Sequence, residues 1–127
     1  MDVTPLVRQG SKIVQSYTGG KFRISGEVHE GAVLVTQDNV KPWDASAPVK
    51  DLTEADFDAL IAMRDEFDVV LMGTGNTLTF LDPRLRAALK AKGLHVEVMD
   101  SGAACRTYNV LMAEGRRVVA AMLPYRS

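Results

Sequence analysis

The second half of the chain alternates short apolar stretches with amphipathic ones, and this alternation constrains the fold more than any other feature. The apolar stretches at 68–72, 95–99 and 118–123 have the length of buried strands. The segments between them, 82–93 and 100–115, each begin with a residue suited to helix capping and end with a glycine. Strands joined by helices of this length favour parallel pairing with right-handed crossovers. We therefore predict a strand–helix–strand–helix–strand unit.

The first third of the chain carries the signals of antiparallel strands instead. Lys12–Tyr17 and Lys21–Ser25 flank a Thr-Gly-Gly connection that suits a hairpin. A second turn signal precedes Ala32–Thr36, an apolar run typical of a buried strand. Together the two parts predict one α/β domain over residues 1–127, with N-terminal β-hairpins and a central mixed sheet covered by helices.

The composition is that of an ordinary globular protein and excludes several classes. Of the 127 residues, 46% are hydrophobic and 24% charged, which is too apolar for a disordered chain. The 15 basic and 16 acidic side chains leave a net charge of −1, so we expect no nucleic-acid partner. One cysteine excludes an internal disulfide and a cysteine-rich zinc site, and it fits a reducing compartment.

The sequence also lacks the signals of export and of membrane insertion. The N-terminus has neither the apolar core of a secretory signal nor the basic, serine-rich character of a transit peptide. No apolar run approaches the roughly 20 residues that span a bilayer. We therefore expect a cytoplasmic protein without a membrane-spanning segment, and we predict neither a cofactor nor a metal.

The loop Gly73-Thr74-Gly75-Asn76 is the first candidate site, since open α/β sheets bind ligands beyond the carboxyl ends of their strands. Glycines let backbone N–H groups approach an anion closely. The dinucleotide fingerprint fails, however, because Leu78 stands at its third glycine and the next helix starts only near Asp82. No Lys-Ser or Lys-Thr pair follows, which excludes a P-loop. We favour a tight turn with positive φ over a phosphate site.

The predicted helix 101–114 is the second candidate. Its sheet-facing stripe is expected to consist of Ala104, Thr107, Tyr108 and Leu111. Cys105, Arg106 and Asn109 are expected on the opposite side as surface neighbours. Asparagine inside a helix costs about 0.6 kcal/mol relative to alanine. Asn109 therefore indicates a solvent-exposed helix face, a bond to a nearby loop, or a polar pocket or docking surface made with the 73–77 loop.

Cys105 invites a catalytic interpretation, because the helix dipole and Arg106 both favour a thiolate in the first helical turn. A nucleophilic cysteine also needs a base. The two histidines are His29, in the hairpin region, and His95, at the start of a strand, where it is expected at the other end of the sheet. We therefore favour an inert cysteine and predict no catalytic residue.

Two further features have ordinary structural explanations. Glu27, His29 and Glu30 lie around a predicted turn, where three such residues are more typical of solvated charge than of a metal site. Trp43 follows the predicted buried strand and is expected to pack over a sheet edge, with contact to a partner as the alternative.

Several segments over nearly the whole chain carry a family resemblance: Gly73-Thr74-Gly75, Ala103-Ala104-Cys105-Arg106-Thr107-Tyr108-Asn109 with Glu114-Gly115-Arg116, Ala120-Ala121-Met122-Leu123-Pro124, and Phe22-Arg23-Ile24 with Gly31, Leu34 and Trp43. On these motifs the chain resembles the family called domain of unknown function 498. The long 103–109 motif is the specific one. The resemblance implies a three-layer α/β fold with a central mixed sheet, and it supplies no established catalytic residue.

The same resemblance bears on partners, because the family includes a mitochondrial assembly factor of respiratory complex I that acts through protein contacts. The chain lacks the targeting segment of these mitochondrial relatives and looks like a bacterial counterpart. The leading hypothesis is a non-catalytic binding or assembly protein whose partners are respiratory-complex subunits or assembly proteins. The alternative is a small-molecule binder or thiol-dependent enzyme that uses the Gly73–Gly75 loop with Cys105 and Arg106. The residues predicted to line a pocket or bind a partner are Gly73, Thr74, Gly75, Asn76, Cys105, Arg106 and Asn109.

Overall fold

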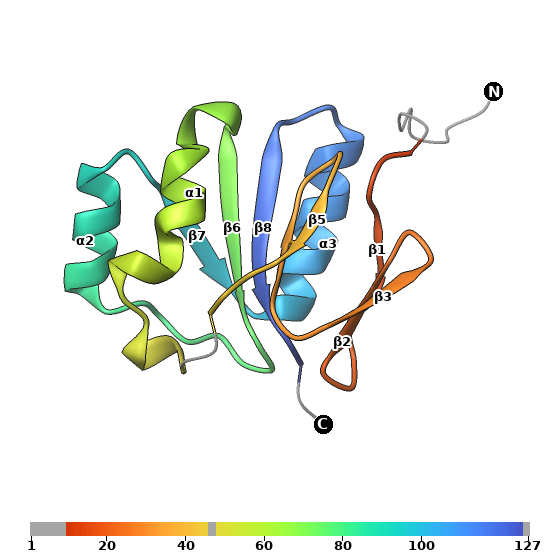
Figure 1. The fold of residues 1–127 in the computed structure, drawn as a ribbon, viewed down its shortest axis with the longest axis horizontal. Helices are drawn as coiled ribbons and strands as arrows, with labels where there is room; N and C mark the ends of the chain where they lie inside the picture. The colour runs from red at the N-terminus through yellow and green to blue at the C-terminus, as the bar shows by residue number, and fades with distance from the viewer. Residues whose placement is uncertain (1–9, 46–47, 126–127) are drawn as a thin grey trace.

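In the computed structural model, which describes residues 10–45 and 48–125, the strands form two separate sheets (Figure 1). A three-stranded antiparallel sheet has the order β1-β2-β3, with strands Val14–Ser16, Lys21–Ile24 and Glu27–Glu30. A five-stranded sheet has the order β5-β4-β8-β6-β7, with strands β4 Val33–Val35, β5 Val40–Pro42, β6 Val69–Thr74, β7 Val96–Met99 and β8 Val118–Leu123.

The helices all follow β5, and α2 and α3 begin directly after the predicted caps Asp82 and Asp100. Their bounds are α1 Asp58–Ala62, α2 Pro83–Ala91 and α3 Ser101–Ala113, with short 3₁₀ turns η1 Val49–Asp51, η2 Glu54–Phe57 and η3 Arg64–Glu66. The Asp82 carboxylate accepts the Arg84 N–H at 2.8 Å. The Asp100 carboxylate accepts the Ala103 N–H at 2.9 Å. Each aspartate satisfies a first-turn N–H that has no partner within the helix.

The five-stranded sheet is mixed, as predicted. Strand β6 lies between β8 and β7 and pairs with both in parallel, as expected for strands connected by helices. Strand β4 pairs antiparallel with β8 on one side and with β5 on the other. The last strand in the sequence, β8, therefore lies in the middle of the sheet.

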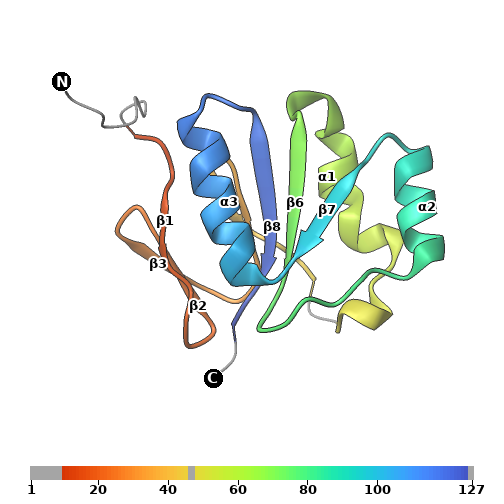
Figure 2. The same cartoon turned by 180° about the vertical axis from the view of Figure 1, so that it is seen from behind.

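Helices cover both faces of this sheet and complete the predicted three-layer α/β fold (Figures 1 and 2). On one face, α3 packs through Tyr108 against Leu71 of β6 and Ala120 of β8, all fully buried. On the other face, Leu60 of α1 and Leu89 of α2 belong to the same buried cluster as Met72 of β6. Leu71 and Met72 are neighbours in β6 but pack in opposite layers, because successive side chains of a strand point to opposite faces of the sheet.

The N-terminal sheet does not extend the central sheet but packs beside α3 (Figure 2). Phe22 and Ile24 of β2 are 0% and 1% exposed and belong to the same cluster as Tyr108 of α3. The helix is therefore enclosed by the central sheet on one side and by the β1–β3 sheet on another. Antiparallel N-terminal strands were predicted, but this separate layer was not.

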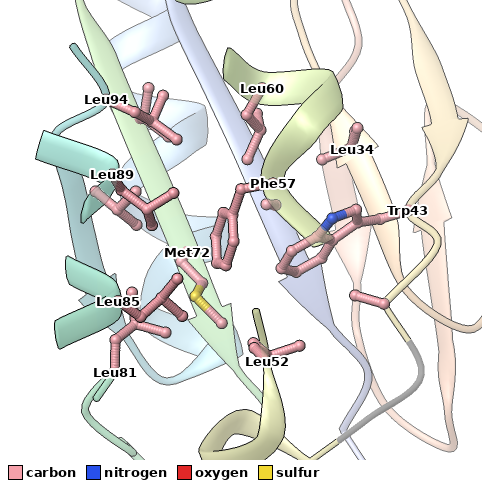
Figure 3. Packing of buried hydrophobic residues seen from close by; sticks show 14 of the residues in the cluster. Leu34, Trp43, Leu52, Phe57, Leu60, Met72, Leu81, Leu85, Leu89 and Leu94 are labelled. Carbon is pink, nitrogen blue, oxygen red and sulfur yellow. The ribbon is translucent and has the colours of Figure 1, made fainter. Parts of the chain in front are cut away.

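Figure 3 shows the cluster on the opposite face, to which Trp43 belongs. The Trp43 ring lies edge-on to Phe57, with 5.7 Å between ring centroids, and its Nε1–H donates to the Asp56 carbonyl at 2.8 Å. A tryptophan that is only 5% exposed needs such a partner for its N–H. Trp43 thus belongs to the core between β5 and η2.

Two strands, β3 and β5, were not predicted from the sequence. The Glu27, His29, Glu30 group forms β3 rather than a turn, and His29 Nε2 lies 3.8 Å from the Glu27 carboxylate. The strand has no apolar alternation, since Val28 is 58% exposed. Strand β3 therefore pairs with β2 through backbone hydrogen bonds. The pattern of side chains in the sequence does not reveal such bonds.

Candidate functional site

The carboxyl end of β6, the carboxyl end of β8 and the start of α3 meet at Ser101, which is fully buried. The Ser101 Oγ accepts the Gly75 N–H at 2.8 Å and donates to the Leu123 carbonyl at 2.5 Å. The Ser101 N–H donates to the Gly75 carbonyl at 2.9 Å. One serine thus joins three elements and fixes the position of the 73–77 loop.

The loop itself is a tight turn that needs its glycines for two different reasons. A Cβ at Gly73 would lie 2.7 Å from Ser101 Oγ and 2.8 Å from Ser101 Cα, so no side chain fits there. Gly75 has a φ of 93°, which other residues adopt only with strain. The Thr74 hydroxyl donates to the Thr77 carbonyl at 2.6 Å and accepts the Thr79 N–H at 3.1 Å, which closes the turn.

The N-terminus of α3 is not open to an anion. Its first N–H groups, those of Ser101 and Ala103, donate to the Gly75 carbonyl and the Asp100 carboxylate. The ring of Tyr17 covers Gly102, where an added Cβ would lie 3.0 Å from Tyr17 Oη. This arrangement supports the structural interpretation of the loop over a phosphate site.

A cleft of about 640 Å³ opens beside the loop, on the face of the sheet that α1 and α2 cover. One wall is formed by the loop residues Thr74, Gly75, Asn76 and Thr79. The segments Trp43–Ala45 and Pro48–Lys50 line it from the other side, and Leu123 with Pro124 contributes the end of β8. Asp44 and Lys50 are its charged lining residues. The cleft therefore sits where ligands of open α/β sheets bind.

Cys105 lies in the protein core and not on a polar face. Its side chain is 2% exposed, and its Sγ–H points to Met122 Sδ at 3.3 Å. Burial raises the pKa of the Cys105 thiol from 9.0 to about 12, and the opposing effect of Arg106 does not offset this. The predicted helical face was wrong at this residue: the sheet-facing stripe of α3 is Ala104, Cys105, Tyr108 and Met112.

Arg106 and Asn109 hold the N-terminal strand against α3. The Asn109 amide donates to the Val14 carbonyl at 2.9 Å and accepts the Val14 N–H at 3.0 Å. Arg106 is exposed, and its Nη1–H donates to the Tyr17 hydroxyl at 3.1 Å. Of the three interpretations of Asn109, the structure shows the bond to a nearby segment, which explains an asparagine inside a helix.

The predicted site residues therefore fall into two groups. Thr74, Gly75 and Asn76 line the cleft, and Gly73 lies behind them against Ser101. Cys105, Arg106 and Asn109 follow α3 away from the loop and do not line the cleft. That either group binds a ligand or a partner stays a prediction.

The role of Ser101 as a junction was not predicted from the sequence. The wall formed by Trp43, Asp44 and Lys50 was not predicted either. The only local signal for that wall was the single tryptophan beside a proline, because the wall forms through contacts between distant segments.

Comparison with known proteins assigns this chain to a family. The model of the family described as "Protein of unknown function (DUF498/DUF598)" matches residues 14–123. The chain belongs to this family. The match begins at β1 and ends with β8, so it includes both sheets and the loop at Gly73.

Two related sequences and one solved structure illustrate the kinds of protein to which this chain is similar. An uncharacterised protein of Rhodobacter capsulatus is 37% identical over 115 residues, which cover 91% of this chain and 86% of the relative. NADH dehydrogenase (ubiquinone) 1 alpha subcomplex assembly factor 3 of Mus musculus is 32% identical over 87% of this chain. The match spans only 60% of that assembly factor's length. The crystal structure of an outer membrane protein from Bartonella henselae superposes with a TM-score of 0.80 at 32% identity, covering 92% of this chain and 98% of that one.

We predict that Asn109→Ala lowers the free energy of unfolding by about 1.5 kcal/mol, because two hydrogen bonds to Val14 are lost while helix propensity improves. Urea denaturation followed by circular dichroism measures the change. The neighbouring Val110→Ala is the matched control, since Val110 is 56% exposed. Equal stability of the two variants would show that the Asn109 bonds do not stabilise the fold.

We predict that Cys105 of the folded protein reacts with iodoacetamide far more slowly than free cysteine at neutral pH. Raising the pKa from 9.0 to about 12 lowers the thiolate fraction about a thousandfold. In urea the rate should rise to that of a free thiol. Reaction of the folded protein at the free-cysteine rate would contradict this prediction.

The raised pKa of the Cys105 thiol also makes the free energy of unfolding depend on pH in the alkaline range. The folded-state pKa lies above the unfolded one, so the contribution of the protonated thiol is complete below pH 9.0 and is lost as the pH rises toward about 12.

Proposed function

We propose that this protein is a non-catalytic binding protein that assists the assembly of a respiratory complex, with complex I as the candidate. The observation that carries the proposal is the match to assembly factor 3, at 32% identity in Mus musculus and 31% in Homo sapiens, over 87% of this chain in both. An assembly-type role is thereby supported at the level of the family, and its transfer to this chain is our proposal.

The use of the 103–109 motif in the structure disfavours the alternative of a thiol-dependent enzyme. Ala104 and Tyr108 pack in the core, and Asn109 holds β1. Cys105 has a raised pKa and is buried, which disfavours nucleophilic chemistry. Residues that suggested chemistry in the sequence thus maintain the shape of the molecule.

We further propose the cytoplasm as its compartment, which suits a protein whose single cysteine is free and buried. Across residues 10–45 and 48–125, no helix is both long and apolar enough to cross a bilayer.

A second candidate function rests on the cleft. Its volume of about 640 Å³ and its place at the carboxyl ends of β6 and β8 suit a small ligand. Thr74, Gly75 and Asn76, all predicted site residues, line it together with Asp44 and Lys50.

The assembly role is tested in cells that express the protein at its native level. Affinity purification of a tagged chain should recover respiratory-complex subunits or other assembly proteins. Deletion of the gene should lower the amount of mature complex I on native gels, and the wild-type gene should restore it. An unchanged amount of complex I together with the recovery of no specific partner would refute the proposal.

The small-molecule candidate is tested by a thermal-shift screen of metabolites. Thr79 lines the cleft and is exposed, so Thr79→Trp should fill it. Thr77→Trp, in the same loop but outside the cleft lining, is the matched control. A ligand should stabilise the wild type and Thr77→Trp but not Thr79→Trp. A screen without hits, or hits that Thr79→Trp retains, would count against a site in the cleft.

A further inference from the structure

Strand β3 forms an exposed edge of the N-terminal sheet. The strand order is β1-β2-β3, and within the described part of the chain β3 pairs with β2 alone. Glu27, Val28 and Glu30 of this strand are exposed, and His29 is half-buried. Figures 1 and 2 both show the sheet at the end of the molecule opposite α2. The backbone groups of an edge strand can pair with a strand of another chain.

The register of the β2–β3 hairpin shows which backbone groups of β3 point outward. The Gly31 N–H donates to the Gly20 carbonyl at 3.2 Å, one step beyond Glu30, the last residue of β3. Hydrogen-bonded and non-hydrogen-bonded pairs alternate along an antiparallel ladder. Glu30 and Val28 therefore form non-hydrogen-bonded pairs with β2, and their N–H and C=O groups point toward the free edge.

The side chains of β3 suit pairing with a second copy of the same strand. Val28 is 58% exposed and lies on one face of β3, whereas Glu27 and His29 lie on the other, because successive side chains alternate. When two copies of β3 pair antiparallel with Val28 opposite Val28, Glu27 of each copy lies opposite His29 of the other. The strand is therefore complementary to itself, since a histidine N–H donates to a carboxylate.

The other symmetric registers lack this complementarity. Centring the pair on Glu27 or on Glu30 places two carboxylates directly opposite each other, which destabilises a strand pair. Centring it on His29 places two imidazoles opposite each other. Of the four registers centred on a residue of β3, the one at Val28 alone sets the Glu27 carboxylate opposite the His29 imidazole. It also brings together two residues whose backbone groups already point outward.

We propose that two copies of this chain associate through antiparallel pairing of their β3 strands, in the register centred on Val28. The Val28 N–H of each copy donates to the Val28 carbonyl of the other, and the two N-terminal sheets become one continuous sheet. The two valine side chains meet on one face, and two Glu27–His29 pairs form on the other. This self-association goes beyond the proposed assembly role, which concerns a different protein as partner.

The short strands indicate that this dimer is weak. Four residues from each copy bury much less surface than the roughly 1,200–2,000 Å² of a stable interface. We therefore expect a monomer at about 10 μM and a growing share of dimer toward about 1 mM.

Sedimentation velocity of the purified full chain over this concentration range tests the proposal, and the average mass should rise. Val28→Pro removes the outward N–H without removing a hydrogen bond of the hairpin, because proline is accepted where an edge N–H faces solvent. This variant should stay monomeric throughout. Val28→Thr keeps both the N–H and the β-branched shape, so it is the matched control and should still dimerise. Circular dichroism at about 10 μM checks that both variants are folded.

A charge exchange tests the register. His29→Glu places a carboxylate opposite Glu27 of the other copy, and it should raise the dissociation constant about tenfold because the pair occurs twice in the dimer. Adding Glu27→His restores a carboxylate opposite each imidazole, so the double variant should dimerise like the wild type. In the wild type, hydrogen exchange of the Val28 amide should slow as the concentration rises. The His29 amide faces β2 and should exchange equally slowly at every concentration.

A monomeric mass at every concentration would overturn the inference, as would a dimer that folded Val28→Pro retains. A double variant that dimerises no better than His29→Glu would refute the register. The hydrogen exchange of the wild type decides the matter if Val28→Pro does not fold, since a Val28 amide that exchanges at the same rate at all concentrations is incompatible with the pairing.

Discussion

The close approach of α3 to β6 is the constraint on which the rest of this structure depends. At Gly73 the strand has no side chain, and Ser101 occupies the space that a Cβ would need. Because Ser101 also bonds to Gly75 and Leu123, this single contact aligns the ends of two parallel strands with the start of a helix. The turn at residues 73–77 and the wall of the cleft that this loop forms both take their position from this junction.

Farther along α3, Tyr108 and Asn109 attach the N-terminal sheet to the helix. The Asn109 amide pairs with both backbone groups of Val14 in the manner of a neighbouring strand. Tyr108 adds a hydrogen bond from its hydroxyl to the Lys12 carbonyl at 2.8 Å. These three bonds satisfy backbone groups of a segment that has a sheet partner on only one side and would otherwise need water. The motif that marks the family is thus largely explained by packing and by backbone satisfaction.

The elements predicted well from the sequence are those whose signals are local. Strand β8 has the predicted bounds, and α2 and α3 start at their predicted caps, because apolar runs and caps act over a few residues. The face of α3 was predicted incorrectly at Cys105 because a helix between two sheets has more than one buried side, and periodicity assumes one. The cleft wall at Trp43 and Lys50 was beyond prediction for a similar reason: it forms where segments far apart in sequence meet.

The position of β8 has a consequence for how the chain folds as it is made. Before β8 is synthesised, β4 has only β5 to pair with, and β6 has only β7. The two halves of the central sheet cannot join until the last described strand enters between them. The residues that then become fully buried are small or flexible, Val119, Ala120, Ala121 and Met122, and so fit a narrow gap. A nascent chain therefore exposes both half-sheets to water until β8 leaves the ribosome, and the central sheet can form cooperatively only after that strand is available.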